Sequence, residues 1–289
     1  MFSGAAMVDG WSTGFRSDPI LGPFRPPSRA RRSRWQTRFR VDVQDRIDQL
    51  IERQRAPLVE GLLLVKDVVL YQPHSTPTLG VNSTFFVVLD GAHEAFHKPF
   101  AGVSTHAGVQ YGQDPDSVPL NECAAWRLAA QVGGLVAEIV APCVLRSISG
   151  SAGSLSARRV GHPHAAEPFL VAPDQCRAAA FIDALIAQQD RHMGNYRWDP
   201  HDSRLGLIDH GYAFAVPRWR FNASCFVDWR HNQGDAGLDE WELASLEQLL
   251  QSGDLHGLAG VLGDEQASAL ADRARRMRDR GEILHQGEW

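Results

Sequence analysis

The chain has 289 residues, of which 44% are hydrophobic, and it carries a formal net charge of −5. A chain of this length and composition can bury a sizeable core and form one bilobal domain or two small ones. Its acidic balance argues against nucleic acid as the main partner, and no apolar run approaches the roughly 20 residues needed to cross a bilayer.

The N-terminal segment and the cysteines indicate a cytoplasmic protein. The first residues lack a basic stretch followed by an apolar core, so they do not predict a secretory signal. The cysteines are scattered, without a Cys-x-x-Cys pair, which is typical of a reduced compartment. They are Cys123, Cys143, Cys176 and Cys225. Membrane contact is not indicated.

Residues 1–40 are rich in Gly, Pro, Ser and Arg, and they contain eight arginines. Such a composition predicts an extended, basic leader without a packed core. Residues 41–55 follow with apolar side chains at helical spacing, which predicts one amphipathic helix.

The middle of the chain predicts a sheet interrupted by one helix. Short runs of β-branched and aromatic residues predict strands within 61–71, 83–91, 93–100 and 140–161. Asp90 and Gly91 form a strong hairpin signal between two of these runs. Residues 119–134 have helical spacing, and Gly133 is placed to end that helix.

The rest of the chain is mainly helical in pattern. The expected helices span 174–189, 239–251 and 264–280. The order of strands, one helix, strands and then helices predicts an α+β protein with a sheet-rich front half and a helical rear half.

A short polar hairpin, residues 188–211, holds the candidate catalytic residues. Asp190 and Asn195 have the spacing of a kinase catalytic loop, in which Asp contacts the attacking hydroxyl and Asn holds magnesium. This spacing alone is common. Two expected short strands follow it, however, and the second ends in Asp209, which can aim a second carboxylate at the same point. Mg²⁺ prefers such oxygen ligands, although the same side chains could instead cap their own turns.

The stretches "DRHMGN" and "IDHG" resemble the catalytic and metal-binding loops of the phosphoinositide 3-/4-kinase-like family. This family of atypical kinases includes lipid kinases, related protein kinases and small bacterial members. The resemblance covers about residues 60–250. It implies a bilobal, protein kinase-like fold with a sheet-rich N-lobe in 41–160 and a reduced, mainly helical C-lobe in 161–289. It also implies Asn195 and Asp209 as ligands of Mg²⁺, with Mn²⁺ as an alternative.

A kinase also needs a cation on the ATP phosphates, which is usually a strand lysine paired with a helix glutamate. Lys98 ends the second expected hairpin strand, and Glu122 lies in the next helix, in the order that the family uses. Only Lys66 and Lys98 are lysines, so a solubilising role for Lys98 at a sheet edge is the weaker explanation. Lys66 is expected to be structural or exposed.

The candidate nucleotide loop is a polar turn between two expected strands. Gly80 supplies backbone freedom, and Asn82, Ser83 and Thr84 are candidate phosphate contacts, as hydroxyl side chains are in similar kinases. An ordinary polar β-turn explains these residues equally well.

The catalytic base is left open between Asp190 and His192. Asp190 is the first choice because its offset from Asn195 fits a kinase loop. A neutral histidine has a pKa near 6.5, so His192 could accept the proton instead, or it could hydrogen-bond the Asp209 loop. Arg191 is expected to brace the loop.

The leading hypothesis is an ATP- and magnesium-dependent phosphotransferase, a kinase that acts on a hydroxyl of a protein or small molecule. One alternative is a pseudokinase that binds nucleotide as a scaffold. Another is a metal-dependent phosphohydrolase that uses Asp190, His192, Asp209 and His210. Transfer of a nucleotide onto protein could use the same residues as the kinase reaction.

Overall fold

The computed structural model describes most of the chain after residue 57. The described residues are 58–74, 82–103, 114–162, 167–216, 224–253, 255 and 258–288. The expected leader, 1–40, and the helix expected at 41–55 lie outside these ranges, so both stay predictions.

Five strands form one antiparallel sheet in the order β1-β2-β3-β5-β4. The strands are β1 (Val68–Pro73), β2 (Phe85–Leu89), β3 (His93–Pro99), β4 (Cys143–Ile148) and β5 (Ser151–Ala157). The hairpin expected at Asp90 and Gly91 joins β2 to β3, and Gly91 has a φ of 83°, where glycine meets no steric penalty. The Gly/Ser turn expected within 140–161 joins β4 to β5 at Ser149 and Gly150.

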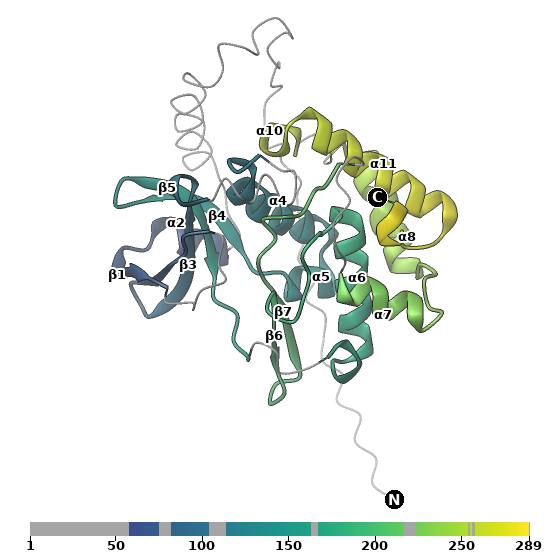
Figure 1. Cartoon of the computed structure of the whole chain (residues 1–289), viewed down its shortest axis with the longest axis horizontal. Coiled ribbons are helices and arrows are strands. Elements are labelled where there is room, and N and C mark those ends of the chain that lie inside the picture. The colour runs from purple at the N-terminus through teal and green to yellow at the C-terminus, as the bar shows by residue number, and fades with distance from the viewer. Residues whose placement is uncertain are drawn as a thin grey trace, which may run out of the picture.

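Helices cover both faces of this sheet (Figure 1). α2 (Leu58–Val65) lies on one face, where Leu63 packs in a buried cluster with side chains of β2, β3, β4 and β5. α4 (Ser117–Val132) packs on the opposite face, against β4 and β5. Successive strand residues point to opposite faces. Lys98 of β3 therefore faces α4, whereas its neighbour His97 is buried on the α2 side.

The interpretation of residues 61–71 as a single strand is wrong in its first part. Residues 61–65 belong to α2, and the strand begins at Val68. A short, continuous apolar run does not distinguish a strand from a buried helix by periodicity. Packing against the sheet selects the helix here.

The helical part of the chain begins beside α4. Its helices are α5 (Gly134–Ile139), α6 (Pro173–Ile186), α7 (Cys225–Asn232), α8 (Glu240–Ser252), α10 (Ala259–Leu262) and α11 (Asp264–Arg280). The helices expected at 174–189, 239–251 and 264–280 are therefore confirmed, and Gly133 ends α4 as expected. α5, α7 and α10 were not predicted, because helices this short carry little periodicity.

A two-stranded hairpin, β6 (Tyr196–Asp199) and β7 (Arg204–Leu207), follows α6 as expected. Figure 1 shows it beside α5, between the five-stranded sheet and the helices on the far side. The expected α+β class, with a sheet-rich front half and a mainly helical rear half, is confirmed. Within the described residues, no helix combines the length and the apolar character required to cross a membrane.

Candidate active site

Lys98 is the centre of a three-residue ion cluster that joins both parts of the fold. Its Nζ lies 2.5 Å from Glu122 Oε1 on α4 and 2.6 Å from Asp209 Oδ1, just after β7. Burial alone would lower the pKa of Lys98, but the two carboxylates raise it above its ordinary value. Burial would likewise raise the pKa of Glu122, and Lys98 with His210 holds it well below its usual range. Both groups are therefore charged at neutral pH.

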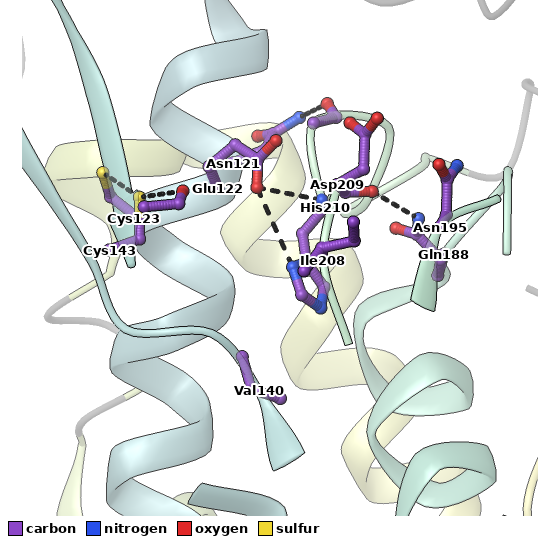
Figure 2. Close-up of polar contacts among 12 residues, drawn as sticks. Asn121, Glu122, Cys123, Val140, Cys143, Gln188, Asn195, Ile208, Asp209 and His210 are labelled. Atoms are coloured by element: carbon purple, nitrogen blue, oxygen red, sulfur yellow. Dashed lines mark hydrogen bonds and ion pairs between the residues drawn. The ribbon is translucent and has the colours of Figure 1, made fainter. Parts of the chain in front are cut away.

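The two side chains Asn121 and Glu122 fasten α4 to the segment after Asp209 (Figure 2). Glu122 Oε2 accepts a hydrogen bond of 3.0 Å from the backbone N–H of His210. The fully buried Asn121 donates to the carbonyls of Gly211 (2.8 Å) and Ala213 (3.1 Å). The helix that carries the lysine partner and the loop that carries Asp209 are thus held in one fixed relation.

The catalytic-loop residues predicted from the sequence lie together. α6 ends at Ile186, and the next residue, Ala187, has a left-handed φ of 48° and turns the chain toward Asp190. Asn195 Nδ2 donates to the Asp190 carbonyl at 2.6 Å and lies 3.3 Å from Asp190 Oδ2. Gln188 Nε2 donates to the Asp209 carbonyl at 3.1 Å. Figure 2 shows this contact between Gln188 and Asp209, with Asn195 beside Gln188.

A buried ion pair holds this loop from beneath. The guanidinium of Arg191 binds the carboxylate of Asp183 on α6, and neither side chain has any exposed surface. Ser224 Oγ donates to the same carboxylate at 2.7 Å. Arg191 also donates to the carbonyls of Asn195 and Ile208. The expected brace is therefore present, and it ties the predicted catalytic loop to the residue that precedes Asp209.

His192 lies at the edge of the site, with 60% of its side chain exposed. Its Nδ1 accepts a 2.9 Å hydrogen bond from the backbone N–H of Gly194, so the proton of the neutral ring lies on Nε2. Nε2 is 3.8 Å from Asp190 Oδ1. In this arrangement the ring faces Asp190 and not the Asp209 loop. Burial, in the first place, raises the pKa of Asp190 above its ordinary value, while His192 lowers it.

Two oxygen donors meet the requirements of a divalent cation. Asn195 uses its amide nitrogen on Asp190, which leaves its amide oxygen for a ligand. Asp209 uses Oδ1 on Lys98, and its side chain is 36% exposed. Among the described residues, no group of three or more His, Cys, Asp and Glu side chains could hold a metal. Carboxylate and amide oxygens are ligand types that magnesium accepts, and it usually takes its other ligands from water and substrate phosphates.

The residues predicted to contact phosphate are less closely gathered. Gly80 lies outside the described residues. Asn82 reaches the site, since its Nδ2 donates to the hydroxyl of Tyr212 at 3.3 Å. The backbone N–H of Ser83 is already used by the Gly102 carbonyl at 2.8 Å. Thr84 lies at the start of the sheet, where its carbonyl accepts from His74.

Several residues that hold the site were not predicted from the sequence. Asn121 directly precedes Glu122, and Gln188 shortly precedes Asp190, but neither position belongs to a recognisable motif. Gln266 of α11 lies 3.4 Å from Asn121 Oδ1 and from the Phe214 carbonyl. Through these contacts α11 helps to hold the segment that follows Asp209.

No protein-family model matches this chain, and no curated protein matches it at a significant level. Among solved structures, the Golgi casein kinase is similar over 91% of both chains, with 12% identity and a TM-score of 0.47. A structure of that kinase with Mn/ADP bound is similar over 93% of both chains, with 14% identity and a TM-score of 0.47. The Helicobacter pylori proinflammatory kinase CtkA is similar over 76% of this chain and 94% of the CtkA chain, with 10% identity and a TM-score of 0.38.

Proposed function

We propose that this chain is an ATP-dependent kinase that transfers the γ-phosphate to a hydroxyl group. The contact of Lys98 with both Glu122 and Asp209 carries this proposal. A partly buried lysine fixed by a helix glutamate and facing a second carboxylate is the arrangement that positions ATP phosphates beside a metal ion. A phosphohydrolase has no need of the Lys98–Glu122 pair.

Each residue has a role in this reaction. Lys98 binds nucleotide phosphate, and Glu122 keeps its ammonium group in place. Asn195 and Asp209 are the ligands for magnesium, which when bound neutralises charge on the transferred phosphate. Lys98 and Asp209 contact each other directly in this structure, so nucleotide binding would exchange part of that contact for contacts to phosphate. The chain therefore acts mainly by positioning charge.

Asp190 is the proposed base for the acceptor hydroxyl. Its raised pKa brings it closer to neutral pH, which strengthens a carboxylate as a proton acceptor. His192 is a weaker candidate, because Nδ1 already accepts from Gly194 and Nε2 carries the ring proton. We assign His192 to the orientation of Asp190.

The finer assignments belong to the same proposal. Membership of the phosphoinositide 3-/4-kinase-like group is supported by "DRHMGN" and "IDHG" in the two loops that meet at the site. A protein or small-molecule hydroxyl is the proposed acceptor. The proposed N-lobe, 41–160, contains the five-stranded sheet, and the proposed C-lobe, 161–289, contains the catalytic loop and most helices.

Asp209→Asn gives the cleanest test of this function. Asp209 has a φ of 58°, which Asn adopts more readily than Ala, so the variant removes charge with little backbone strain. Asp202→Asn in the exposed β6–β7 turn is the matched control. We expect wild type and Asp202→Asn to bind ADP in calorimetry with Mg²⁺, and to release ADP from ATP. Asp209→Asn should lose the Mg²⁺-dependent part of ADP binding and of ADP release from ATP.

The products distinguish kinase activity from its alternatives. A kinase yields ADP together with a phosphorylated acceptor, detected by intact mass and by radiolabel from the γ-phosphate. Nucleotide transfer would release pyrophosphate and label the acceptor from the α-phosphate. Binding without turnover of any labelled ATP would indicate a pseudokinase. If the wild type binds no nucleotide with Mg²⁺ or Mn²⁺, the proposal fails.

A further inference from the structure

The proposed site carries more negative than positive charge around Lys98. The carboxylates of Glu122 and Asp209 contact the ammonium of Lys98, and a third carboxylate, that of Asp190, lies 3.3 Å from the amide nitrogen of Asn195. The phosphates of a nucleotide add several negative charges, and a metal ion offsets only some of them. A further cation near the Asn195 side of the site would balance this charge.

Arg197 is a cation in that position. It lies on β6, directly opposite Gly206 of β7 and one residue after the buried Tyr196. Neighbouring strand residues alternate in direction, so Tyr196 and Trp198 point into the core while Arg197 points to the other side, where it is partly exposed. Its NH1 group donates to the carbonyls of Gly194 and Tyr196, both at 2.9 Å.

These contacts place the guanidinium beside the catalytic loop. Gly194 directly precedes Asn195, the proposed metal ligand, and the backbone N–H of Gly194 binds His192. On the other side, the stem of Arg159 lies against Gly206, within 2.8 Å of the position that a Cβ there would occupy. Arg197 therefore lies between the catalytic loop and the connector that follows β5.

Part of the guanidinium is available for a ligand. Among the described residues, the hydrogen bonds of Arg197 use only NH1, which leaves the donors of Nε and NH2. Burial, in the first place, lowers the pKa of Arg197, whereas the charge of Asp209 raises it and that of Arg158, which pairs with Glu94, lowers it. A planar guanidinium with three N–H donors left, one on Nε and two on NH2, matches the oxygens of a phosphate group.

We propose that Arg197 binds a phosphate group of the nucleotide and is a nucleotide-binding residue of this site. This inference rests on the proposed kinase function. Its physical basis is that NH1 is anchored to two loop carbonyls, so the remaining donors are held in a fixed direction without a large loss of side-chain freedom. The catalytic loop thereby carries its own cation, in addition to the lysine supplied by the sheet.

The alternative is that Arg197 only stabilises the loop through its two carbonyl contacts. A purely structural residue would change protein stability, or would affect all ligands of the site equally. A phosphate contact instead discriminates between nucleotides and the nucleoside. The comparison of ADP with adenosine therefore separates the two explanations.

The experiment measures the affinities of ADP and adenosine by calorimetry with Mg²⁺. The variants are Arg197→Gln and Arg197→Lys, and the matched control is Arg204→Gln, an exposed arginine on the same hairpin, opposite Asp199. We expect Arg197→Gln to weaken ADP about tenfold or more, as for the loss of a charge-assisted hydrogen bond. Adenosine affinity should be unchanged, Arg197→Lys should recover part of the ADP affinity, and Arg204→Gln should match wild type.

Two outcomes would overturn the inference while leaving the kinase proposal standing. One is that Arg197→Gln binds ADP with the same affinity as the wild type. The other is an equal loss of ADP and adenosine affinity in both Arg197 variants, which would assign the residue to loop structure. If wild type binds neither ligand, the proposed function itself fails, and Arg197 loses its role with it.

Discussion

The buried ion pair beneath the catalytic loop can be tested by removing one partner. Asp183→Ala would leave the guanidinium of Arg191 without a counter-charge in a place where neither side chain is exposed. Breaking a buried pair in this way costs about 3–5 kcal/mol of unfolding free energy. The loss also removes the acceptor of Ser224 Oγ, so we place the expected value at the upper end of that range.

The double variant Asp183→Ala/Arg191→Met removes both charges at once. Replacing a buried pair with apolar groups is often close to neutral in stability, so we expect the double variant to regain at least about 2 kcal/mol relative to Asp183→Ala. It should not regain activity. Arg191 also donates to the carbonyls of Asn195 and Ile208, and methionine cannot replace those bonds.

The assays are urea unfolding for stability and Mg²⁺-dependent ADP binding for the site. Asp202→Asn, in the exposed β6–β7 turn, serves as the control. An Asp183→Ala variant that loses less than about 1 kcal/mol would show that the guanidinium finds another partner or water. A double variant less stable than Asp183→Ala would show that the carbonyl contacts outweigh the cost of the unpaired charge.

Three further changes test the site. Lys98→Met should reduce turnover by about 10²-fold or more, as for the loss of a main electrostatic group, and unchanged kcat would contradict the role of Lys98. Asp190 must be unprotonated to act as a base, and burial raises its pKa. On lowering the pH, kcat/KM should therefore begin to fall at a higher pH than it would if the base were an exposed aspartate. His192 lowers the pKa of Asp190, so His192→Gln should move the acidic limb of the pH profile to higher pH; an unmoved limb would argue against Asp190 as base. Asn121→Leu removes the hydrogen bonds to the Gly211 and Ala213 carbonyls and should cost about 2–3 kcal/mol in urea unfolding, with weaker Mg²⁺-dependent ADP binding. Unchanged Mg²⁺-dependent ADP binding would show that the site does not need these two bonds.

Local patterns determined most of the secondary structure and the order of the candidate residues. The short runs of β-branched and aromatic residues and the turn at Asp90 and Gly91 predicted the β2–β3 hairpin, because strand preference and turn conformation depend on neighbouring residues alone. The same locality explains the error at residues 61–65, whose apolar run fits a helix or a strand equally well. The placement of Asp190 and Asn195 in one loop also needs only their short separation.

Tertiary structure alone decided which side chains meet. Lys98 and Asp209 are 111 residues apart, and Gln266 and Asn121 are 145 residues apart, so no local period relates them. The family resemblance predicted the roles of Lys98 and Glu122. It did not predict the hydrogen bonds from Asn121 to the Gly211 and Ala213 carbonyls, or the contact of Gln266 on α11 with Asn121. Those contacts exist because burial brings α4, α6 and α11 into one core, where each buried polar group must find a hydrogen-bond partner. The sequence thus determined the chemical groups available, and packing of distant helices determined their relative positions.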